Sequence, residues 1–444
     1  MAFSMKKYVN IYLIYLYIIF NYKIKMIYDV IIIGGGIAGL NSAYKLIKKD
    51  PTLKILLLEK NKLGGRIYTY HDRYYQIEEG AARFHEKQKN ILTLIRELGL
   101  AEKIIKITNT IEYIPIKNAQ NIIQENKDQL INKVIEASKL EKKSVLKTIT
   151  FIEYAKKIVK KENAQLILDS FGYSSELTIM NTYDAINLIK NNLNPKNQFY
   201  VLKGGLSQMI EKLYQILNKS GVQVLIHRKV NDIQYIQSKS TTNFEISCDK
   251  IIQKYYAKKC ICAVTKETLL QLPIFNPIYN ILNKIHSSPL CRIYSKFNKD
   301  PKTNKVWFQG MEKFTTNNNL RYVIPIDEEN GVIMISYTDN KYADFWKKIQ
   351  DTKGIDEVNR ELQRLIKQTC KIDIPIPEHT KISYWKHGVA YYGIEFDSEI
   401  MLKKIMKPYK DIPLFVCGEN FSEKQSQWIE GSLETSEKVV KQVL

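Results

Sequence analysis

The sequence has few of the residues that build metal sites or disulfide frameworks. Its 444 residues include six cysteines and six histidines, with no C-x-x-C pair and no cluster of histidines. Zinc sites and disulfide-rich scaffolds both need closely spaced cysteines, so this scarcity argues against both classes. We therefore expect free thiols, no metal ion, and a protein of a reducing compartment, the cytoplasm.

Acidic residues are also few relative to basic ones. There are 46 Asp plus Glu against 67 Lys plus Arg, which gives a net charge of +21. Such an excess attracts polyanions, including nucleic acid and acidic membranes. The lysines are dispersed along the chain and no nucleic-acid-binding motif accompanies them, so we do not expect nucleic acid as a partner.

The N-terminal apolar run is shorter than an ordinary membrane span of about 20 residues. Residues 11–20, IYLIYLYIIF, follow a lysine pair and resemble in length a signal sequence or signal anchor. Because Met26 directly precedes the first predicted strand, we treat residues 1–25 as a hydrophobic extension that the folded domain does not need. Membrane association through residues 8–20 stays open as the alternative.

The first folded segment carries a nucleotide-binding pattern. Residues 30–33 are four apolar β-branched residues, typical of a strand buried on both faces of a parallel sheet. In the GGGIAG that follows, Gly34, Gly36 and Gly39 have the G-x-G-x-x-G spacing. The first glycine permits the tight turn, the second lets the backbone approach a pyrophosphate, and the third lets the helix pack closely on the strand.

The next forty residues extend this pattern to a strand–helix–strand unit. Apolar residues recur at helical spacing as far as Asp50-Pro51, and residues 53–58 form a second apolar strand that ends at Glu59. Glu59 lies about 20 residues after the last glycine, where an acid binds the adenosine ribose hydroxyls and disfavours NADP. Up to this point NAD and FAD remain equally open.

A second glycine pair decides for a flavin. LGGRIYT contains Gly64, Gly65 and Arg66, a turn that a ligand can approach and a cation that can bridge a pyrophosphate. Further segments are GAARFH (80–85), VLKGGL (201–206), HRKVNDI (227–233) and PLFVCGENFSEKQSQWIEGSLETS (413–436). Together with them the chain resembles the flavin-containing amine oxidase superfamily, which includes monoamine, polyamine and L-amino-acid oxidases and flavin histone demethylases.

The resemblance implies an α/β fold in which an FAD-binding Rossmann-type, two-dinucleotide-binding domain is interleaved with an α+β substrate domain. No glycine occurs between Gly99 and Gly172, a composition that favours helices, so we expect a helical insertion there. The expected parts are a hydrophobic extension (1–25), FAD-binding segments (26–84, 196–270 and 386–444), the helical insertion (85–195) and a substrate-domain sheet (271–385).

The resemblance also implies which residues bind FAD. They are Gly34, Gly36, Gly39, Glu59, Gly65, Arg66, Gly80, Ala81, Arg83, Val230, Gly418, Glu419, Trp428 and Ile429. A helix beginning near residues 427–429 would aim its positive end at the part of the flavin that gains negative charge on reduction. No cysteine directly precedes WIEG, so we expect FAD to be bound non-covalently.

On the substrate side the resemblance implies an aromatic cage of Tyr391 and Trp428, with Trp385 behind it. A neutral amine between the two rings would give hydride to flavin N5, the imine would hydrolyse, and oxygen would reoxidise the flavin to yield hydrogen peroxide. The family lysine near the flavin falls at Arg292 in SSPLCRIYSKF, while Lys296 stands one residue before a phenylalanine. A permanently charged arginine cannot act as a base, which leaves open a flavin-binding protein with little turnover.

Arg83 offers an alternative substrate. In L-amino-acid oxidases a similar G-A-x-R stretch supplies an arginine that binds the substrate carboxylate, and GAARFH matches that form. The other interpretation is that Arg83 pairs with a neighbouring acid or with the cofactor. We therefore list Tyr391, Trp428, Arg292 and Arg83 as candidate catalytic residues, with an amine or an amino acid and oxygen as partners.

Overall fold

The computed structural model describes residues 26–116, 126–237, 242–249 and 251–444. The N-terminal extension and its residues 8–20 lie outside the described residues. Within those ranges, no helix is both long and apolar enough to cross a membrane. The same ranges hold six free cysteines and no group of three or more His, Cys, Asp or Glu side chains arranged to hold a metal ion.

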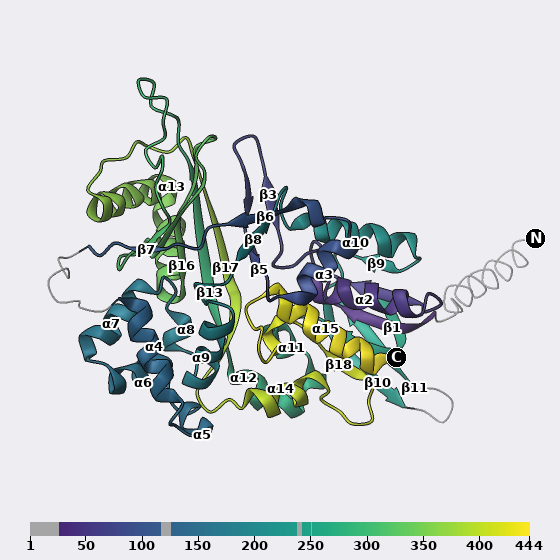
Figure 1. Cartoon of the computed structure of the whole chain (residues 1–444). Helices are drawn as coiled ribbons and strands as arrows, with labels where there is room; N and C mark the ends of the chain where they lie inside the picture. Colours follow the sequence, from purple (N-terminus) through teal and green to yellow (C-terminus); the bar gives the residue numbers. More distant parts are fainter. Residues whose placement is uncertain (1–25, 117–125, 238–241, 250) are drawn as a thin grey trace, which may run out of the picture.

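A seven-stranded sheet forms the nucleotide-binding part of the molecule (Figure 1). Its order is β10-β11-β12-β1-β2-β9, with β18 also paired to β12. The strands are β1 (Ile27–Ile33), β2 (Ile55–Leu58), β9 (Gln223–Leu225), β10 (Val230–Gln237), β11 (Thr242–Cys248), β12 (Ile251–Cys262) and β18 (Leu414–Val416). β1 lies between β12 and β2 and is parallel to both, as the buried run 30–33 predicts.

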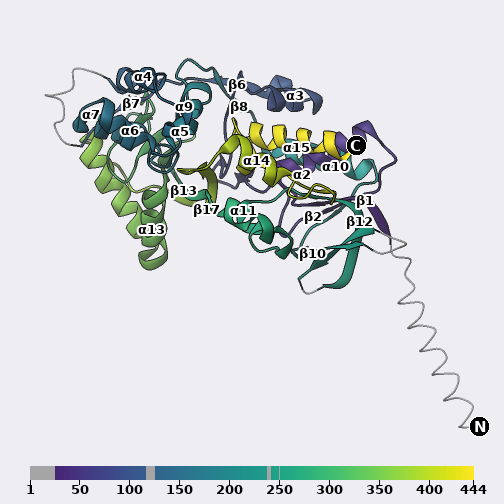
Figure 2. The ribbon, with the colours of Figure 1, turned by 90° about the horizontal axis from the view of Figure 1, so that it is seen from below.

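The helices beside this sheet confirm the predicted strand–helix–strand unit. They are α2 (Ile37–Lys49), α3 (Lys89–Glu97), α10 (Ser207–Lys219) and α15 (Ile429–Val443). α2 ends at Asp50, before Pro51. α2 and α15 lie side by side in Figures 1 and 2, and Asn41 Nδ2 donates to Ser436 Oγ at 2.7 Å. Two helices near opposite ends of the described sequence are thus joined in the nucleotide-binding part.

A six-stranded sheet forms the second part, in the order β17-β13-β16-β15-β14-β7. Its strands are β7 (Glu112–Tyr113), β13 (Ile285–Lys296), β14 (Phe314–Thr315), β15 (Tyr322–Asp327), β16 (Val332–Asp339) and β17 (His379–Tyr392). The long helix α13 (Asn340–Cys370) packs against it around the buried Trp346 and is interrupted at Gly354, whose φ is 79°. β17 runs on to Tyr392, so this sheet extends beyond the expected boundary at residue 385.

Six helices form a third part with its own apolar core (Figure 2). They are α4 (Lys127–Ser138), α5 (Lys143–Leu146), α6 (Phe151–Ile158), α7 (Lys161–Ser170), α8 (Ser175–Thr178) and α9 (Thr182–Asn191). The expected helical insertion at 85–195 is therefore divided between two parts of the molecule. Its first part, with α3, packs into the nucleotide-binding core, because Ile91, Leu94 and Ile95 are buried there.

Two small sheets connect these parts. One has the order β5-β8-β6, and the other pairs β3 with β4. Their strands are β3 (Thr69–His71), β4 (Gln76–Glu78), β5 (Phe84–His85), β6 (Ile104–Ile107) and β8 (Phe199–Leu202). The remaining elements are η1 (Ala101–Lys103), α11 (Lys266–Leu269), η3 (Pro273–Ile278), α12 (Tyr279–Asn283), α14 (Ser398–Met406) and η4 (Glu419–Phe421).

Candidate active site

The glycines of GGGIAG have different physical tasks. Gly34 has φ +107°, and a Cβ there would lie 2.4 Å from the carbonyl oxygen of Ala263. A Cβ on Gly39 would lie 2.0 Å from the Gly34 carbonyl oxygen, so both positions demand glycine for packing. A Cβ on Gly36 would meet no heavy atom within 4 Å. Gly36 therefore leaves open space at the start of α2, where a pyrophosphate could approach the backbone.

The second glycine turn lies directly against the first. Gly64 N donates to Gly35 O at 2.9 Å, and Gly36 and Gly64 form a β-bridge. Gly65 has φ +58°, and its Cβ position is 3.5 Å from Gly36 Cα. Twenty-seven residues of sequence lie between Gly36 and Gly64, yet together the two turns make one surface without side chains. This surface fits the pyrophosphate of a dinucleotide.

Glu59 lies beside these turns at the end of β2. Its side chain is buried and accepts hydrogen bonds from Gly35 N at 2.7 Å and Asn61 N at 2.8 Å. Each carboxylate oxygen keeps further acceptor capacity, as binding of ribose hydroxyls requires. Arg228 N donates to Glu59 O at 2.8 Å, which holds the segment that leads into Val230 next to the same strand end.

Arg66 and Glu419 form an ion pair with each other. Arg66 Nη1 also donates to Gly388 O at 2.9 Å, and Gln427 N donates to Glu419 Oε2 at 2.9 Å. The pair therefore ties the second glycine turn to β17 and to the segment that leads into α15. The resemblance implied that both side chains serve the cofactor, and the pairing between them is a structural role that the sequence did not indicate.

The backbone of Arg66 also holds the GAAR segment (residues 80–83). Ala81 N donates to Arg66 O at 2.9 Å, and a Cβ on Gly80 would lie 2.0 Å from that oxygen. Only glycine permits this close approach. The backbone of residues 80–83 is thereby fixed against the cofactor-binding part of the molecule.

The helix α15 begins as predicted, with Trp428 at the N-cap and Ile429 as its first residue. Trp428 makes no side-chain capping hydrogen bond. Glu430, the acid of the first turn, instead accepts from Asn90 N and Ile91 N, each at 2.9 Å. The helix α2 likewise has no side-chain cap and no acid in its first turn. Both N-termini thus keep the amide donors and partial positive charge that an anionic ligand atom needs.

Tyr391 and Trp428, the expected cage, meet at one apolar cluster. Tyr391 belongs to the core of the helical part and is only 1% exposed, whereas the partly exposed Trp428 packs against that core. Trp428 lies edge-on to His85, with ring centroids 5.5 Å apart, and 6.2 Å from the ring of Phe199. The structure thus brings the two aromatics to the same cluster but covers Tyr391 almost completely.

A buried acid lies beside Tyr391. Glu176 is buried, its Oε2 has no hydrogen-bond partner, and burial together with nearby Asp339 raises its pKa to about 8. Asp339 by contrast accepts from Ser174 N at 2.9 Å and Ser175 N at 2.7 Å. Burial and the neighbouring Glu176 also raise the pKa of Tyr391. The sequence did not single out Glu176.

Arg83 has aromatic neighbours and, among the described residues, no acidic partner. Its guanidinium lies 4.8 Å from the centroid of the Phe199 ring, and within the described residues no carboxylate forms an ion pair with it. Burial opposes its charge, but the hydroxyls of Tyr173, Tyr322 and Tyr337 hold its pKa above the ordinary value. The interpretation that Arg83 pairs with a neighbouring acid therefore does not hold for the described part of the chain.

Arg292 occupies the register position predicted for the family lysine. It lies on β13 opposite Tyr337 of β16, is buried, and donates to Glu78 O at 2.9 Å and to Tyr337 Oη at 3.2 Å. Lys296 lies at the end of the same strand, where it pairs with Glu378 at 2.9 Å. Arg292 thus lies inside β13 and Lys296 at its end, and the replacement of the family lysine by Arg292 stays a prediction. Trp385 Nε1 donates to Glu79 O at 2.7 Å, and Glu79 follows Glu78, whose carbonyl oxygen accepts from Arg292.

Sequence reasoning missed several residues of this site. Phe199, Tyr173, Tyr322 and Tyr337 surround Arg83, but they come from a chain with 29 tyrosines and 15 phenylalanines. No spacing distinguishes them from core aromatics. Only the meeting of β8, β15 and β16 with the GAAR segment identifies them.

A family model described as flavin-containing amine oxidoreductase matches residues 37–444. The chain is 23% identical to an L-amino-acid oxidase of Crotalus adamanteus over 249 residues, which cover 50% of this chain and 48% of that enzyme. It thus spans about half the length of the curated relatives that it matches.

Two solved structures are similar in fold. A protein described as a protoporphyrinogen oxidase from Exiguobacterium sp. 255-15 has a TM-score of 0.70 at 16% identity, covering 94% of this chain and 98% of its own. A putrescine oxidase mutant from a redesign of cofactor binding has a TM-score of 0.74 at 14% identity, covering 94% and 99%. They show that the whole described chain adopts this FAD-binding α/β fold.

Proposed function

Because the chain belongs to the flavin-containing amine oxidoreductases, a family of FAD-dependent oxidoreductases, we propose that it oxidises the C–N bond of an α-amino acid. FAD, bound non-covalently, supplies the hydride acceptor. In the overall reaction the substrate loses two electrons and two protons to oxygen, which becomes hydrogen peroxide. The resulting imine takes up water and yields a 2-oxo acid and ammonia.

One observation carries the choice of substrate, namely the unpaired guanidinium of Arg83. A cation among aromatic side chains is costly unless an anion pairs with it, and a planar guanidinium matches a carboxylate in bidentate geometry. Within the described residues no acid fills that role for Arg83. A substrate carboxylate would do so, while Phe199 links Arg83 to Trp428.

The roles of the chain's own residues follow from this arrangement. Arg83 would bind and orient the carboxylate, and Trp428 with Phe199 would exclude water around the amine end. Arg292 would place a fixed positive charge near the reacting region, because its charge does not titrate in the physiological range. No residue is assigned as a base, since hydride leaves a neutral amine without one.

The test compares each L-amino acid with its own decarboxylated amine. The measured quantity is the second-order rate constant for anaerobic bleaching of the bound flavin. For Arg83→Ala we expect a loss of about 10²–10³-fold for the amino acid, in line with removal of one partner of a close charge pair. The amine should lose less than about threefold on the same scale, and exposed Arg360→Ala, which pairs with Glu357 on α13, is the matched control.

The outcomes separate the alternatives. Equal losses for amino acid and amine would contradict a carboxylate role for Arg83. Bleaching by amines alone would favour the amine oxidase reading with the cage of Tyr391 and Trp428. A flavin that dithionite reduces but that no C–N substrate bleaches would favour a flavin-binding protein with little turnover, the alternative suggested by Arg292 at the position that the resemblance assigns to the family lysine.

A further inference from the structure

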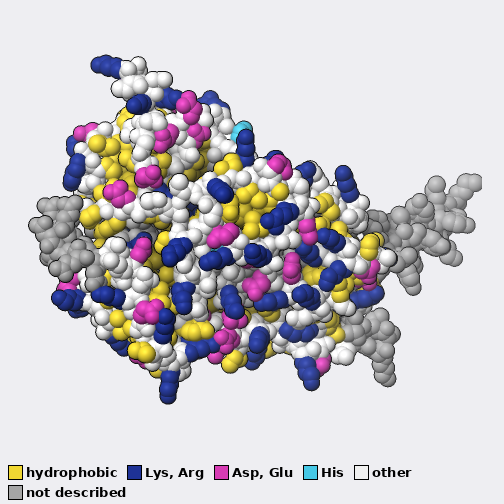
Figure 3. Space-filling view, viewed as in Figure 1, with side chains coloured by type: hydrophobic (Ala, Val, Ile, Leu, Met, Phe, Trp, Pro, Cys, Tyr) yellow, Lys and Arg dark blue, Asp and Glu magenta, His cyan; other side chains and the backbone are white. Residues whose placement is uncertain are grey.

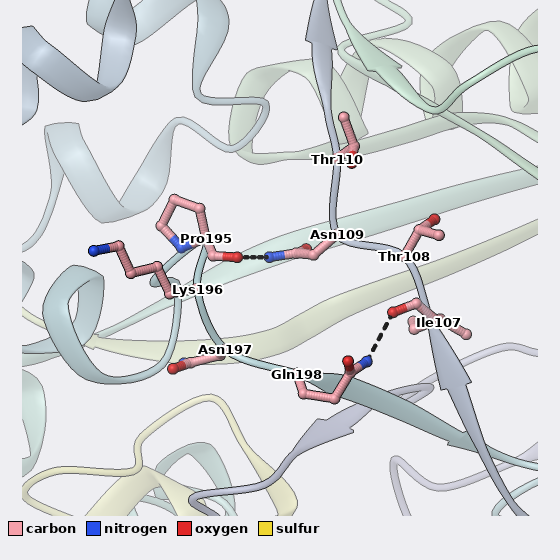
Figure 4. A pocket seen from close by; sticks show the side chains of 8 residues that line it. All are labelled: Ile107, Thr108, Asn109, Thr110, Pro195, Lys196, Asn197 and Gln198. Atoms are coloured by element: carbon pink, nitrogen blue, oxygen red, sulfur yellow. Dashed lines mark hydrogen bonds between the residues drawn. The ribbon is translucent and has the colours of Figure 1, made fainter.

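A pocket opens at the junction of the nucleotide-binding and helical parts. It has a volume of about 380 Å³ and is lined by residues 107–110 and 195–198 (Figure 4). Two hydrogen bonds cross it, Asn109 Nδ2 to Pro195 O at 3.2 Å and Gln198 Nε2 to Ile107 O at 3.1 Å. The two lining segments connect β6 to β7 of the six-stranded sheet and α9 of the helical part to β8. The pocket therefore lies where the chain leaves the small sheet β5-β8-β6 for the six-stranded sheet and returns to it from the helical part.

The pocket adjoins one end of the small sheet β5-β8-β6, and Arg83 directly precedes β5 of the same sheet. Phe199, the residue after Gln198, pairs with Ile107 on one side and with His85 on the other. Its ring is the one that faces Arg83. The lining residue Gln198 is therefore the chain neighbour of Phe199, whose ring centroid lies 4.8 Å from the guanidinium of Arg83.

A buried lysine lies behind one wall of the pocket. Lys313 Nζ donates to the carbonyl oxygen of Thr108, and the residue is 9% exposed. Burial and the charge of Arg83 lower its pKa to about 8, while Glu312 opposes the shift. No ion pair involves Lys313 within the part of the chain that the structure describes. Lys313 thus adds a second cation that contacts the wall of the pocket and lies near Arg83.

We propose that this pocket is the entrance through which a carboxylate-bearing substrate reaches Arg83, with Lys313 as the cation that favours anions on this path. The inference rests on the proposed function and adds the route and its charge selection. Lys196 at the rim is exposed, so cations lie at the mouth, behind the wall and at the end. A path lined with one sign of charge concentrates ligands of the opposite sign and speeds their association.

A second pocket provides the rival route. It has a volume of about 340 Å³ and is lined by residues that include Tyr113, Lys127, Asp128 and Thr315. It also lies near the tyrosines around Arg83, because a Cβ on Gly172 would be 2.9 Å from Thr315 Cγ2, which lines this pocket, and 3.7 Å from Tyr322 Cδ1. Its lysine and aspartate lie 3.9 Å apart and offset each other's charge. This pocket therefore offers an anion less attraction.

The route is tested by blocking each mouth with a bulky side chain in the FAD-loaded protein. Thr110→Trp fills the rim of the first pocket, Asp128→Trp that of the second, and Thr352→Trp on α13 is the control; all three positions are exposed. Benzoate is the probe, with affinity measured by equilibrium dialysis and association followed by stopped-flow absorbance of the flavin. We expect Thr110→Trp alone to slow association and dissociation by about tenfold each, leaving affinity nearly unchanged.

The charge selection is tested at Lys313. Lys313→Met should slow benzoate association by about tenfold at low salt and weaken its dependence on ionic strength, with Lys313→Gln as a second neutral variant. Lys313→Arg should restore both, whereas association of benzylamine should not slow. Lys296→Met, which removes a lysine paired with Glu378 at the end of β13, is the matched control.

Each outcome bears on one claim. Slower association in Asp128→Trp, or in neither pocket variant, would overturn the first pocket as the entrance. Equal effects of Lys313→Met on benzoate and benzylamine would overturn the charge selection. If benzoate does not bind the wild-type protein at all, the carboxylate site itself fails, and the proposed function fails with it.

Discussion

At the scale of single residues, three arginines show how neighbours decide a role that the residue type leaves open. Arg66 pairs with Glu419, so its charge is balanced and ties segments together. Arg292 donates to a carbonyl and to a tyrosine hydroxyl, which hold its position without cancelling its charge. Arg83 lies among aromatic side chains, with the cations Arg292 and Lys313 also near it, and no acid among the described residues forms an ion pair with it. Of the three, Arg83 is the one that most needs an anion from outside the protein.

Glu176 provides a prediction at the same scale. Its pKa is raised to about 8 by burial and by Asp339, so the folded protein holds a proton there that the unfolded chain releases near its ordinary value of about 4.5. The stabilising contribution of the protonated form is present at low pH and is lost as the pH rises through about 8. Deprotonation would leave an unpaired charge beside Asp339 and Tyr391.

We expect Glu176→Gln to abolish this loss of stability at high pH. Relative to wild type, the variant should gain about 1–3 kcal/mol in free energy of unfolding at about pH 9 and little at about pH 5. Denaturant unfolding at both pH values measures the difference. The exposed Glu329→Gln is the control, since its side chain is 85% exposed. A pH-independent effect of Glu176→Gln would contradict the raised pKa.

At the scale of elements, the starts of α2 and α15 are the features that a ligand would complete. Neither helix has a side-chain cap, and the acid in the first turn of α15 is engaged by the start of α3. N-terminal amides without a cap destabilise the protein when no ligand is present, and they stabilise the complex once they donate hydrogen bonds to an anion. The two glycine turns before α2 prepare one such site by keeping side chains out of it.

Gly36 and Gly39 separate packing from ligand binding. A Cβ at Gly39 collides with the Gly34 carbonyl, so Gly39→Ala should lower the unfolding temperature of the FAD-free protein by several degrees. A Cβ at Gly36 meets open space, so Gly36→Ala should leave that temperature nearly unchanged. It should nevertheless weaken FAD binding by about tenfold or more, because the methyl occupies the space of the pyrophosphate.

Thermal unfolding of the FAD-free variants and titration with FAD, followed by quenching of its fluorescence, measure the two quantities. Each variant serves as the control for the other, since both add one methyl group, at Gly36 just before α2 and at Gly39 in its first turn. Equal affinity of Gly36→Ala and wild type for FAD would mean that the pyrophosphate does not approach this turn.

At the scale of the whole molecule, the relevant predictions concern the distribution of surface charge and the non-covalent binding of FAD. On the face shown in Figure 3, lysine and arginine side chains are interspersed with acidic ones, in keeping with the dispersed lysines of the sequence. That nucleic acid is not a partner stays a prediction. A cytoplasmic location, with or without membrane association through residues 8–20, likewise stays a proposal, because those residues lie outside the described ranges.

We expect denaturation to release the flavin. Cys417, the cysteine nearest in sequence to WIEG, is buried in the segment after β18, and burial raises the pKa of its thiol to about 12. It is therefore a poor nucleophile for a thioether bond. Acid or guanidinium treatment followed by ultrafiltration should recover all the flavin in the filtrate. Flavin that stays with the polypeptide on a denaturing gel would contradict this expectation.

The sequence by itself determined the parts of the fold that depend on local pattern. The β-branched run 30–33, the glycine spacing and Asp50-Pro51 predicted β1, the first turn and the end of α2, because strand burial, tight turns and helix termination are decided by neighbouring residues. The WIEG segment likewise marked the start of α15. That Arg292 stands at the position of the family lysine stays a prediction, whereas the structure shows Arg292 buried within β13 and Lys296 paired with Glu378 at the end of that strand.

Tertiary structure alone decided what depends on distant segments. It joined the two glycine turns, paired Arg66 with Glu419, and surrounded Arg83 with aromatics from β8, β15, β16 and the loop before α8. It also moved α3 from the expected helical insertion into the nucleotide-binding core. These contacts arise from packing between residues far apart in the chain, and periodicity along the sequence carries no information about which distant faces meet.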